Sequence, residues 1–145
     1  MPDRLDRIKQ IGFTRAGSWS LDGATIVCEL VQHASARNIL YAFVIEDCVL
    51  YIGKSVRSLC TRMCGYRSPE PTQSTNVRNN RNIRKALERG QLVEVFVLPD
   101  NGLLHYGGFH VNLAAGLEDS LIKELKPAWN GGRKEPSRSA DAKDR

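Results

Sequence analysis

Hydrophobic residues in the middle of the chain form two dense runs with a short polar break between them. The first run covers residues 39–45 and the second covers residues 49–53. Runs of this length around a polar break are typical of a β-hairpin. Neither run alternates with polar residues, so we expect both faces of the hairpin to be covered, as in the central strands of a small sheet.

The spacing of apolar residues predicts four helices, over residues 3–11, 56–63, 74–89 and 116–126. We expect Gly65 to end the second helix, and Ser74 or Thr75 to cap the third. Pro127 should stop the fourth helix, because proline cannot continue one.

Two more segments favour strands. Residues 92–98 alternate between apolar and polar positions, and the β-leaning run 24–31 can pair with the main sheet. Residues 17–19 and 22–23 are typical of turns, and residues 99–115 predict a loop. The pattern therefore predicts an α/β protein of the α+β type, with a small central antiparallel sheet of about three strands flanked by helices.

The length of 145 residues suits one compact domain. We divide it into an N-terminal helix and β extension over residues 1–37, a core over residues 38–130 and a charged tail over residues 131–145. The tail lacks large apolar residues, so we expect it to be disordered. A hydrophobic content of 41% with 26% charged residues excludes wholesale disorder and fibrous proteins.

The net charge of +5 indicates nucleic-acid binding only if it is concentrated in one region. Residues 54–89 hold nine basic residues and two acidic ones, so the excess lies there. Several of these basic residues alternate with asparagines, which favours contacts with phosphates and base edges, although a solvated helix face explains them nearly as well. The candidate nucleic-acid contacts are Lys54, Arg57, Arg78, Arg81, Arg84 and Lys85.

The cysteines and histidines do not predict a metal centre. The four cysteines, at positions 28, 48, 60 and 64, lack the paired spacing of a zinc ribbon and the density of a disulfide scaffold. We interpret them as reduced thiols buried in the core. Trp19 and Trp129 are more typical of core anchors than of base-stacking platforms.

The N-terminal segment is charged where a signal peptide would be apolar, and no stretch is long and apolar enough to span a membrane. We therefore expect an intracellular, cytoplasmic protein without membrane contact, associated with the nucleoid when it binds DNA.

The order of these features resembles the GIY-YIG nuclease family over about residues 39–130. Ile39-Leu40-Tyr41 keeps the tyrosine of the first family motif, and Tyr51-Ile52-Gly53 matches the second motif in full. The helical arginine falls one residue later than the commonest family spacing, which leaves Arg57 as an alternative. The remaining matches are Arg62, Tyr66, Glu118 and Asn130.

The resemblance implies a metal-dependent endonuclease that hydrolyses DNA phosphodiester bonds and leaves a 5′-phosphate and a 3′-hydroxyl. Glu118 would hold one Mg²⁺ or Mn²⁺, and one carboxylate can suffice because Mg²⁺ keeps several waters. Arg62 would contact the scissile phosphate, whose geometry a guanidinium matches and an ammonium does not. Tyr41 would orient or deprotonate the attacking water, close to Tyr51 and Lys54.

Two further roles follow from the same resemblance. Tyr66 would hold a phosphate oxygen or assist proton transfer, and Asn130 would position Glu118 or the substrate. The implied partner is double-stranded or structured DNA, in a restriction-type or repair-associated reaction. One site per chain makes nicking the minimal expectation, and a homodimer could cut both strands.

The hairpin register makes a geometric demand on this hypothesis. Opposed residues share a face, so a two-residue turn at Glu46-Asp47 would pair Tyr41 with Ile52 and put Tyr41 and Tyr51 on opposite faces. A three-residue loop would place them diagonally on one face. A shared site therefore predicts the three-residue loop or another register of the same parity.

Each candidate also has an ordinary explanation when it is taken alone. Tyrosine is a good strand former, Arg62 could be a solvated helix residue, and Glu118 near a helix start interacts favourably with the helix dipole. The conjunction of five positions in the right order favours catalysis. The competing hypotheses are a non-catalytic nucleic-acid-binding module of the same fold and a structural partner whose basic helix docks on an acidic protein.

Overall fold

The computed structural model describes residues 4–100, 102 and 104–131, so the predicted tail lies outside the described residues except for Gly131. The helices are α1 (Arg4–Gln10), α2 (Leu59–Arg67), α3 (Ser74–Glu88), α4 (Leu113–Leu125) and α5 (Ala128–Gly131). The strands are β1 (Thr14–Asp22), β2 (Thr25–Leu30), β3 (Ile39–Ile45), β4 (Cys48–Ser55), β5 (Val93–Pro99), β6 (His105–Tyr106) and β7 (Phe109–His110).

A single antiparallel sheet of five strands, in the order β2-β1-β5-β3-β4, forms the centre of the fold. This confirms the predicted α+β class with an antiparallel sheet. The sheet is larger than the predicted three strands because β1 and β2 both join it. The turn predicted over residues 17–19 is wrong, since these residues lie inside β1. Gly17 is needed there because β2 runs so close that a Cβ would meet the Glu29 carbonyl oxygen at 2.0 Å.

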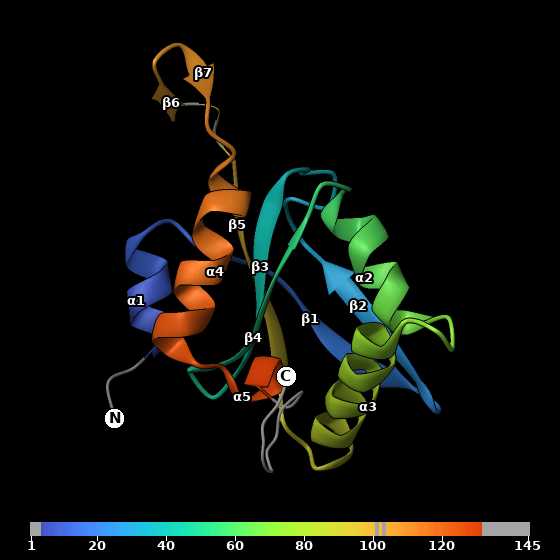
Figure 1. The fold of residues 1–145 in the computed structure, drawn as a ribbon. Helices are drawn as coiled ribbons and strands as arrows, with labels where there is room; N and C mark the ends of the chain where they lie inside the picture. The colour runs from blue at the N-terminus through green and yellow to red at the C-terminus, as the bar shows by residue number, and fades with distance from the viewer. Residues whose placement is uncertain (1–3, 101, 103, 132–145) are drawn as a thin grey trace, which may run out of the picture.

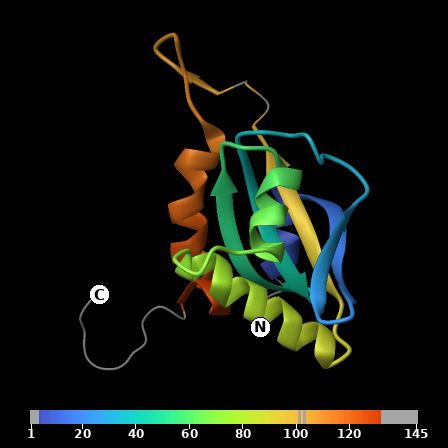
Figure 2. The same cartoon turned by 90° about the vertical axis from the view of Figure 1, so that its right-hand side faces the viewer.

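Helices cover both faces of this sheet. Figure 1 shows α2 and α3 on one side and α1 and α4 on the other, and Figure 2 shows α2 and α3 lying across their face. Each side has its own apolar core. Trp19 lies in the core beneath α3 with 1% of its surface exposed, which confirms it as a core anchor.

The two hairpin strands differ in their place in the sheet. Every residue of β3 is buried, as expected of a central strand. The same prediction is wrong for β4, which lies at the edge of the sheet. The chain continues from β4 into α2 without adding another strand, so helices rather than a neighbouring strand cover it.

Helix α2 begins and ends later than predicted. Ser58 caps it by accepting a hydrogen bond from the Thr61 amide, so the first helical residue is Leu59. The helix then continues through Gly65 to Arg67. Gly65 was expected to stop it and does not, and the extra residues include Tyr66.

Helix α4 begins three residues earlier than predicted, because Asn112 caps it by accepting from the Ala115 amide at 3.2 Å. Glu118 therefore lies beyond the first turn, where the dipole interaction is weak. Helix α3 begins at residue 74 as predicted and ends at Glu88, one residue before the predicted end. Gln73 rather than Ser74 or Thr75 precedes it, and the Gln73 side chain makes no capping bond.

Two more predictions are wrong: that the cysteine thiols are buried in the core, and that the segment after β5 is a plain loop. Cys60 and Cys64 are exposed because Leu59 and Met63 occupy the inward face of α2 and leave these two thiols outside. Cys48, at the start of β4, is also exposed, and Cys28 in β2 is half-buried. The predicted loop after β5 contains the small β6–β7 hairpin, which projects from the body in Figure 1. Among the described residues, no helix is long and apolar enough to cross a membrane.

Replacing Gly17 by alanine should lower the free energy of unfolding by about 1–3 kcal/mol, because the new methyl group would overlap the neighbouring backbone. Urea denaturation measures this change. Gly116 is the matched control, since it has open space within 4 Å and lies in a helix. Gly116→Ala should stabilise the protein by about 0.4–1 kcal/mol. If the Gly17→Ala variant were as stable as the wild type, the close approach of β2 to Gly17 in β1 would be contradicted.

Candidate active site at the edge strand

The β3–β4 hairpin turns through two residues rather than three. Glu46 and Asp47 have positive φ angles of 49° and 65°, and Ile45 pairs with Cys48. Two consecutive positive φ angles match the twist of the flanking strands. The predicted three-residue loop is therefore wrong.

A β-bulge nevertheless brings the two tyrosines to one face. Leu50 has no partner in β3, and this extra residue shifts the register by one. Tyr41 consequently lies opposite Gly53, and Tyr51 lies opposite Phe43. The ring centroids of Tyr41 and Tyr51 are 6.2 Å apart. The predicted parity is confirmed, and the bulge rather than the loop length produces it.

Gly53 leaves the space that the Tyr41 side chain occupies. A Cβ atom at this position would lie 2.6 Å from the Tyr41 hydroxyl oxygen and 2.9 Å from the Tyr51 ring. Any side chain here would displace both rings. The glycine of the Tyr51-Ile52-Gly53 motif thus has a steric reason that sequence analysis alone did not supply.

A hydrogen-bonded chain connects α2 to this face. The hydroxyls of Tyr41 and Tyr66 lie 2.5 Å apart, and Arg62 Nη2 donates to the Tyr66 hydroxyl at 2.8 Å. The Arg62 guanidinium also lies 4.2 Å from the centroid of the Tyr66 ring. Because α2 continues through Gly65, Arg62 and Tyr66 are one helical turn apart. Arg57 lies exposed in the turn before α2, where its amide bonds to Ser55.

The residues of this hydrogen-bonded group differ in how deeply they are buried. Tyr41 and Tyr66 are both fully buried, and burial, reinforced by the neighbouring phenols, raises the pKa of each. Both are therefore neutral near pH 7. Arg62 is half-buried and Tyr51 is 8% exposed, so Arg62 is the member that a ligand in solution reaches most directly.

A second polar pair lies on the other face of β4. Lys54 follows Gly53 directly, so its side chain points away from Tyr41 and toward α4. Its Nζ lies 3.7 Å from Oε1 of Glu118, with 51% of the Lys54 side chain and 23% of the Glu118 side chain exposed. In Figure 1, α2 and α4 lie on opposite sides of β4. The candidate site therefore spans the edge strand.

Asn130 holds the main chain of β4 at Ile52, just before Gly53 and Lys54. Its Oδ1 accepts from the Ile52 amide at 2.8 Å, and its Nδ2 donates to the Ile52 carbonyl at 2.9 Å. The amide thus satisfies the backbone groups that an edge strand leaves open. Asn130 supports the strand that carries Tyr51, Gly53 and Lys54.

Glu118 is the carboxylate of this site. Among the residues that the structure describes, no three acidic, histidine or cysteine side chains gather closely enough to hold a metal. A single partly exposed carboxylate fits a hard cation that keeps most of its water, and it does not fit zinc, which prefers several nitrogen or sulfur ligands.

The basic residues of α3 are only partly available to a ligand. Arg81 and Lys85 are exposed, whereas Arg78 and Arg84 are half-buried. Arg84 donates to the Asn80 side chain at 2.9 Å.

The asparagines of α3 belong mainly to the protein interior. Asn76 and Asn79 are buried, and Asn80 donates to the Tyr66 carbonyl at 2.8 Å, which ties α3 to the end of α2. Sequence analysis missed this role, since asparagines among arginines suit DNA contact equally well.

Comparison with known proteins shows where this arrangement of elements recurs. No protein family model matches the chain, and no curated protein matches it either. Solved structures share its fold, and they include the following two. Bacteriophage T4 EndoII, solved as a glutamate-to-alanine mutant, matches with a TM-score of 0.68 and 23% identity over 88% of this chain and 98% of that chain. The restriction endonuclease Hpy188I in complex with product DNA matches with a TM-score of 0.52 and 16% identity over 92% of this chain and 83% of that chain. The protein therefore has a nuclease-like fold.

Replacing Asn130 by alanine should lower the free energy of unfolding by about 2–4 kcal/mol, because two buried backbone groups of Ile52 lose their partner. Urea denaturation tests this. Asn82→Ala is the control, since the Asn82 amide bonds to no described side chain, and it should change stability by less than about 0.5 kcal/mol. Equal small changes in both variants would show that Asn130 does not support β4.

Stability should fall as the pH rises above about 10, the ordinary pKa of tyrosine. Below that pH the Tyr41 and Tyr66 phenols are protonated in both states. Above it the phenols ionise in the unfolded state but stay protonated in the folded state, where their pKa is raised. Ionisation therefore stabilises the unfolded state, and the free energy of unfolding falls as the pH rises. Tyr66→Phe should reduce the slope of unfolding free energy against pH by up to about 1.4 kcal/mol per unit. Tyr106→Phe, at an 84% exposed position, should leave it unchanged.

Proposed function

We propose that the protein is a metal-dependent endonuclease of the GIY-YIG type that hydrolyses phosphodiester bonds in DNA. One arrangement carries the proposal: Arg62, Tyr66 and Tyr41 form a hydrogen-bonded chain on one face of β4 beside Gly53, and Lys54 pairs with Glu118 on the opposite face of the same strand. The fold likeness to EndoII and to a restriction endonuclease bound to product DNA supports it.

Arg62 is the group proposed to bind the scissile phosphate. One of its five N–H donors is used by Tyr66, and the stacking on the Tyr66 ring restricts its orientation. The other donors can meet a phosphate in the forked geometry that guanidinium provides. A donor that is oriented before the substrate arrives stabilises developing charge without reorganisation.

Tyr41 and Tyr66 are proposed to act as neutral phenols. Removing a proton from either would oppose the raised pKa that burial causes. Their hydroxyls are better suited to fix Arg62 and to orient a neighbouring oxygen than to act as strong bases. Tyr51, at the border of the same aromatic group, completes the wall of the site.

Glu118 is proposed to hold Mg²⁺ or Mn²⁺, with Lys54 beside it. Such an ion, when bound, neutralises charge on the phosphate and makes a water molecule more acidic. The Lys54 ammonium, 3.7 Å from the carboxylate oxygen, also offsets part of its charge. Lys54, Arg57, Arg81 and Lys85 are exposed positive charges available to the DNA backbone. One site per chain cuts one strand, so cutting both strands requires a second copy.

A plasmid assay tests the proposal. Wild-type protein with Mg²⁺ or Mn²⁺ should convert supercoiled plasmid to the nicked form, and a chelator should stop the reaction. Arg62→Lys and Glu118→Gln should each reduce the rate about 10²- to 10³-fold, since each removes an interaction with developing charge or with the ion.

Matched controls come from the same helices. Arg67→Lys changes an exposed arginine of α2, and Glu124→Gln changes an exposed glutamate of α4 that pairs with Arg7. Both should retain cleavage within about threefold of wild type. If the wild type binds the plasmid without nicking it under any metal condition, the non-catalytic binding module replaces the proposal. If the control variants lost as much cleavage activity as the site variants, the roles assigned to Arg62 and Glu118 would be wrong.

A further inference from the structure

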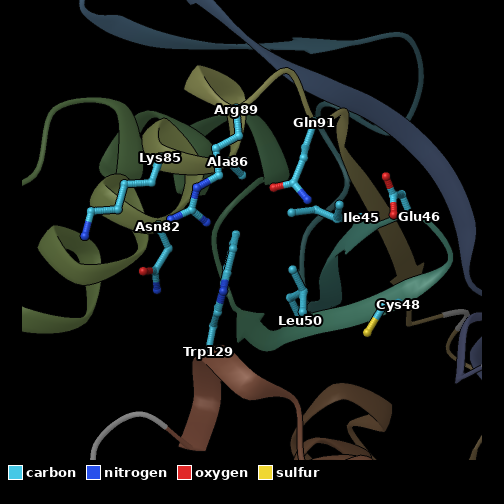
Figure 3. A pocket seen from close by; sticks show the side chains of 10 residues that line it. All are labelled: Ile45, Glu46, Cys48, Leu50, Asn82, Lys85, Ala86, Arg89, Gln91 and Trp129. Carbon is cyan, nitrogen blue, oxygen red and sulfur yellow. The ribbon is translucent and has the colours of Figure 1, made fainter. Parts of the chain in front are cut away.

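A cavity lies at the turn end of the β3–β4 hairpin, between the second half of α3 and α5. Its volume is about 520 Å³, which is within the range of small-molecule binding sites. Figure 3 shows the side chains that line it. The lining side chains include Leu50, Asn82, Lys85, Arg89, Gln91 and Trp129.

Trp129 supplies an aromatic wall of this cavity. It is half-buried, and an edge-to-face contact with Phe43, with ring centroids 6.4 Å apart and planes at 62°, holds the indole in place. Figure 3 shows the ring edge-on, with Asn82 to one side and Leu50 to the other. A fixed aromatic ring beside an open space is a platform on which nucleic-acid bases stack. Trp129 thus packs against the core, as predicted, and also lines the cavity with the rest of its ring.

Two amides border the same cavity. The side chains of Asn82 and Gln91 make no hydrogen bond within the described part of the chain. An amide carries a donor and an acceptor side by side, and it can pair with the edge of a base, adenine above all. These groups suit a planar ligand with polar edges better than a purely apolar one.

Positive charge lies at one end of the cavity. Lys85 is on the last turn of α3 and Arg89 follows it, both exposed, whereas Glu46 lies at the opposite side in Figure 3. The C-terminus of a helix carries only about half a negative charge, so two full positive charges outweigh it. An anionic group is therefore expected near Lys85 and Arg89 and away from Glu46.

We infer that this cavity binds a nucleotide, with its base stacked on Trp129, its base edge toward Asn82 and Gln91, and its phosphate toward Lys85 and Arg89. The combination of the aromatic wall, the Asn82 and Gln91 amides and the basic end matches the base, the base edge and the phosphate of one ligand class. The source of the nucleotide is either a free mononucleotide or an unpaired nucleotide of a nucleic-acid strand.

The second source would deepen the proposed nuclease function. Trp129 contacts Phe43, and Phe43 contacts Tyr51, so the cavity continues the aromatic face of the candidate active site. Tyr41 and Ile45 are four residues apart in β3, a distance of about 13 Å along a strand. Ile45 lines the cavity, so the cavity lies about that far along β3 from Tyr41, toward the hairpin turn.

Calorimetric titration with mononucleotides, in chelator so that no cleavage occurs, tests the inference. We expect the wild type to bind dAMP, and to bind inorganic phosphate or deoxyribose 5-phosphate far more weakly. Trp129→Leu should weaken dAMP binding about 5- to 100-fold, and Trp129→Phe should recover part of it. Arg89→Ala should weaken it about tenfold.

Arg67→Ala is the matched control for Arg89→Ala, because Arg67 is an exposed arginine at the end of α2 and lies outside the cavity lining. It should bind dAMP as the wild type does. Melting temperatures show whether the Trp129 variants fold, and Arg89→Ala keeps the test decisive if they do not.

A DNA strand with one unpaired 2-aminopurine separates the two sources. Quenching of this base that depends on Trp129 indicates a strand nucleotide, and dAMP binding without such quenching indicates a free nucleotide. If neither probe responds to Trp129→Leu or Arg89→Ala, the inference is overturned. Glu118→Gln should bind both probes normally, so a failure of cleavage and a failure of this site are distinguishable.

Discussion

Tyr41 can lie across β4 only because residue 53 has no side chain. Its hydroxyl occupies the space that a Cβ at Gly53 would take, and the bulge at Leu50 brings Gly53 opposite Tyr41. With the two-residue turn and no bulge, Tyr41 would face Ile52 and the tyrosines would lie on opposite faces. The aromatic face, the hydrogen bond to Tyr66 and the orientation of Arg62 all depend on this one register.

The edge position of β4 lets one strand serve two polar groups. Successive residues of a strand point to opposite faces, so Gly53 admits Tyr41 on one side while Lys54 meets Glu118 on the other. An open edge is normally a liability, and here the side chain of Asn130 bonds to the exposed backbone of Ile52 in place of a neighbouring strand.

The residues of the candidate site differ in burial, and this difference separates their functions. The two buried phenols keep their protons and hold Arg62, while Lys54 is exposed to solvent and Glu118 is partly exposed. A rigid buried support behind an accessible charge is the arrangement expected of a site that stabilises negative charge. The nuclease-like fold is consistent with this division, although the residues rather than the fold carry the functional argument.

The sequence by itself determined the class of the fold, the hairpin, the extent of α3 and the candidate residues, because apolar periodicity and short motifs are local signals. It did not determine that β1 joins the sheet, that α2 passes through Gly65, or that the thiols of α2 face outward. Those outcomes depend on contacts between distant segments. Tertiary structure alone decided the bulge at Leu50, the bonds from Asn130 to β4 and the cavity beside Trp129. Each requires residues far apart in the chain to meet, and no local pattern records which partner a side chain will find.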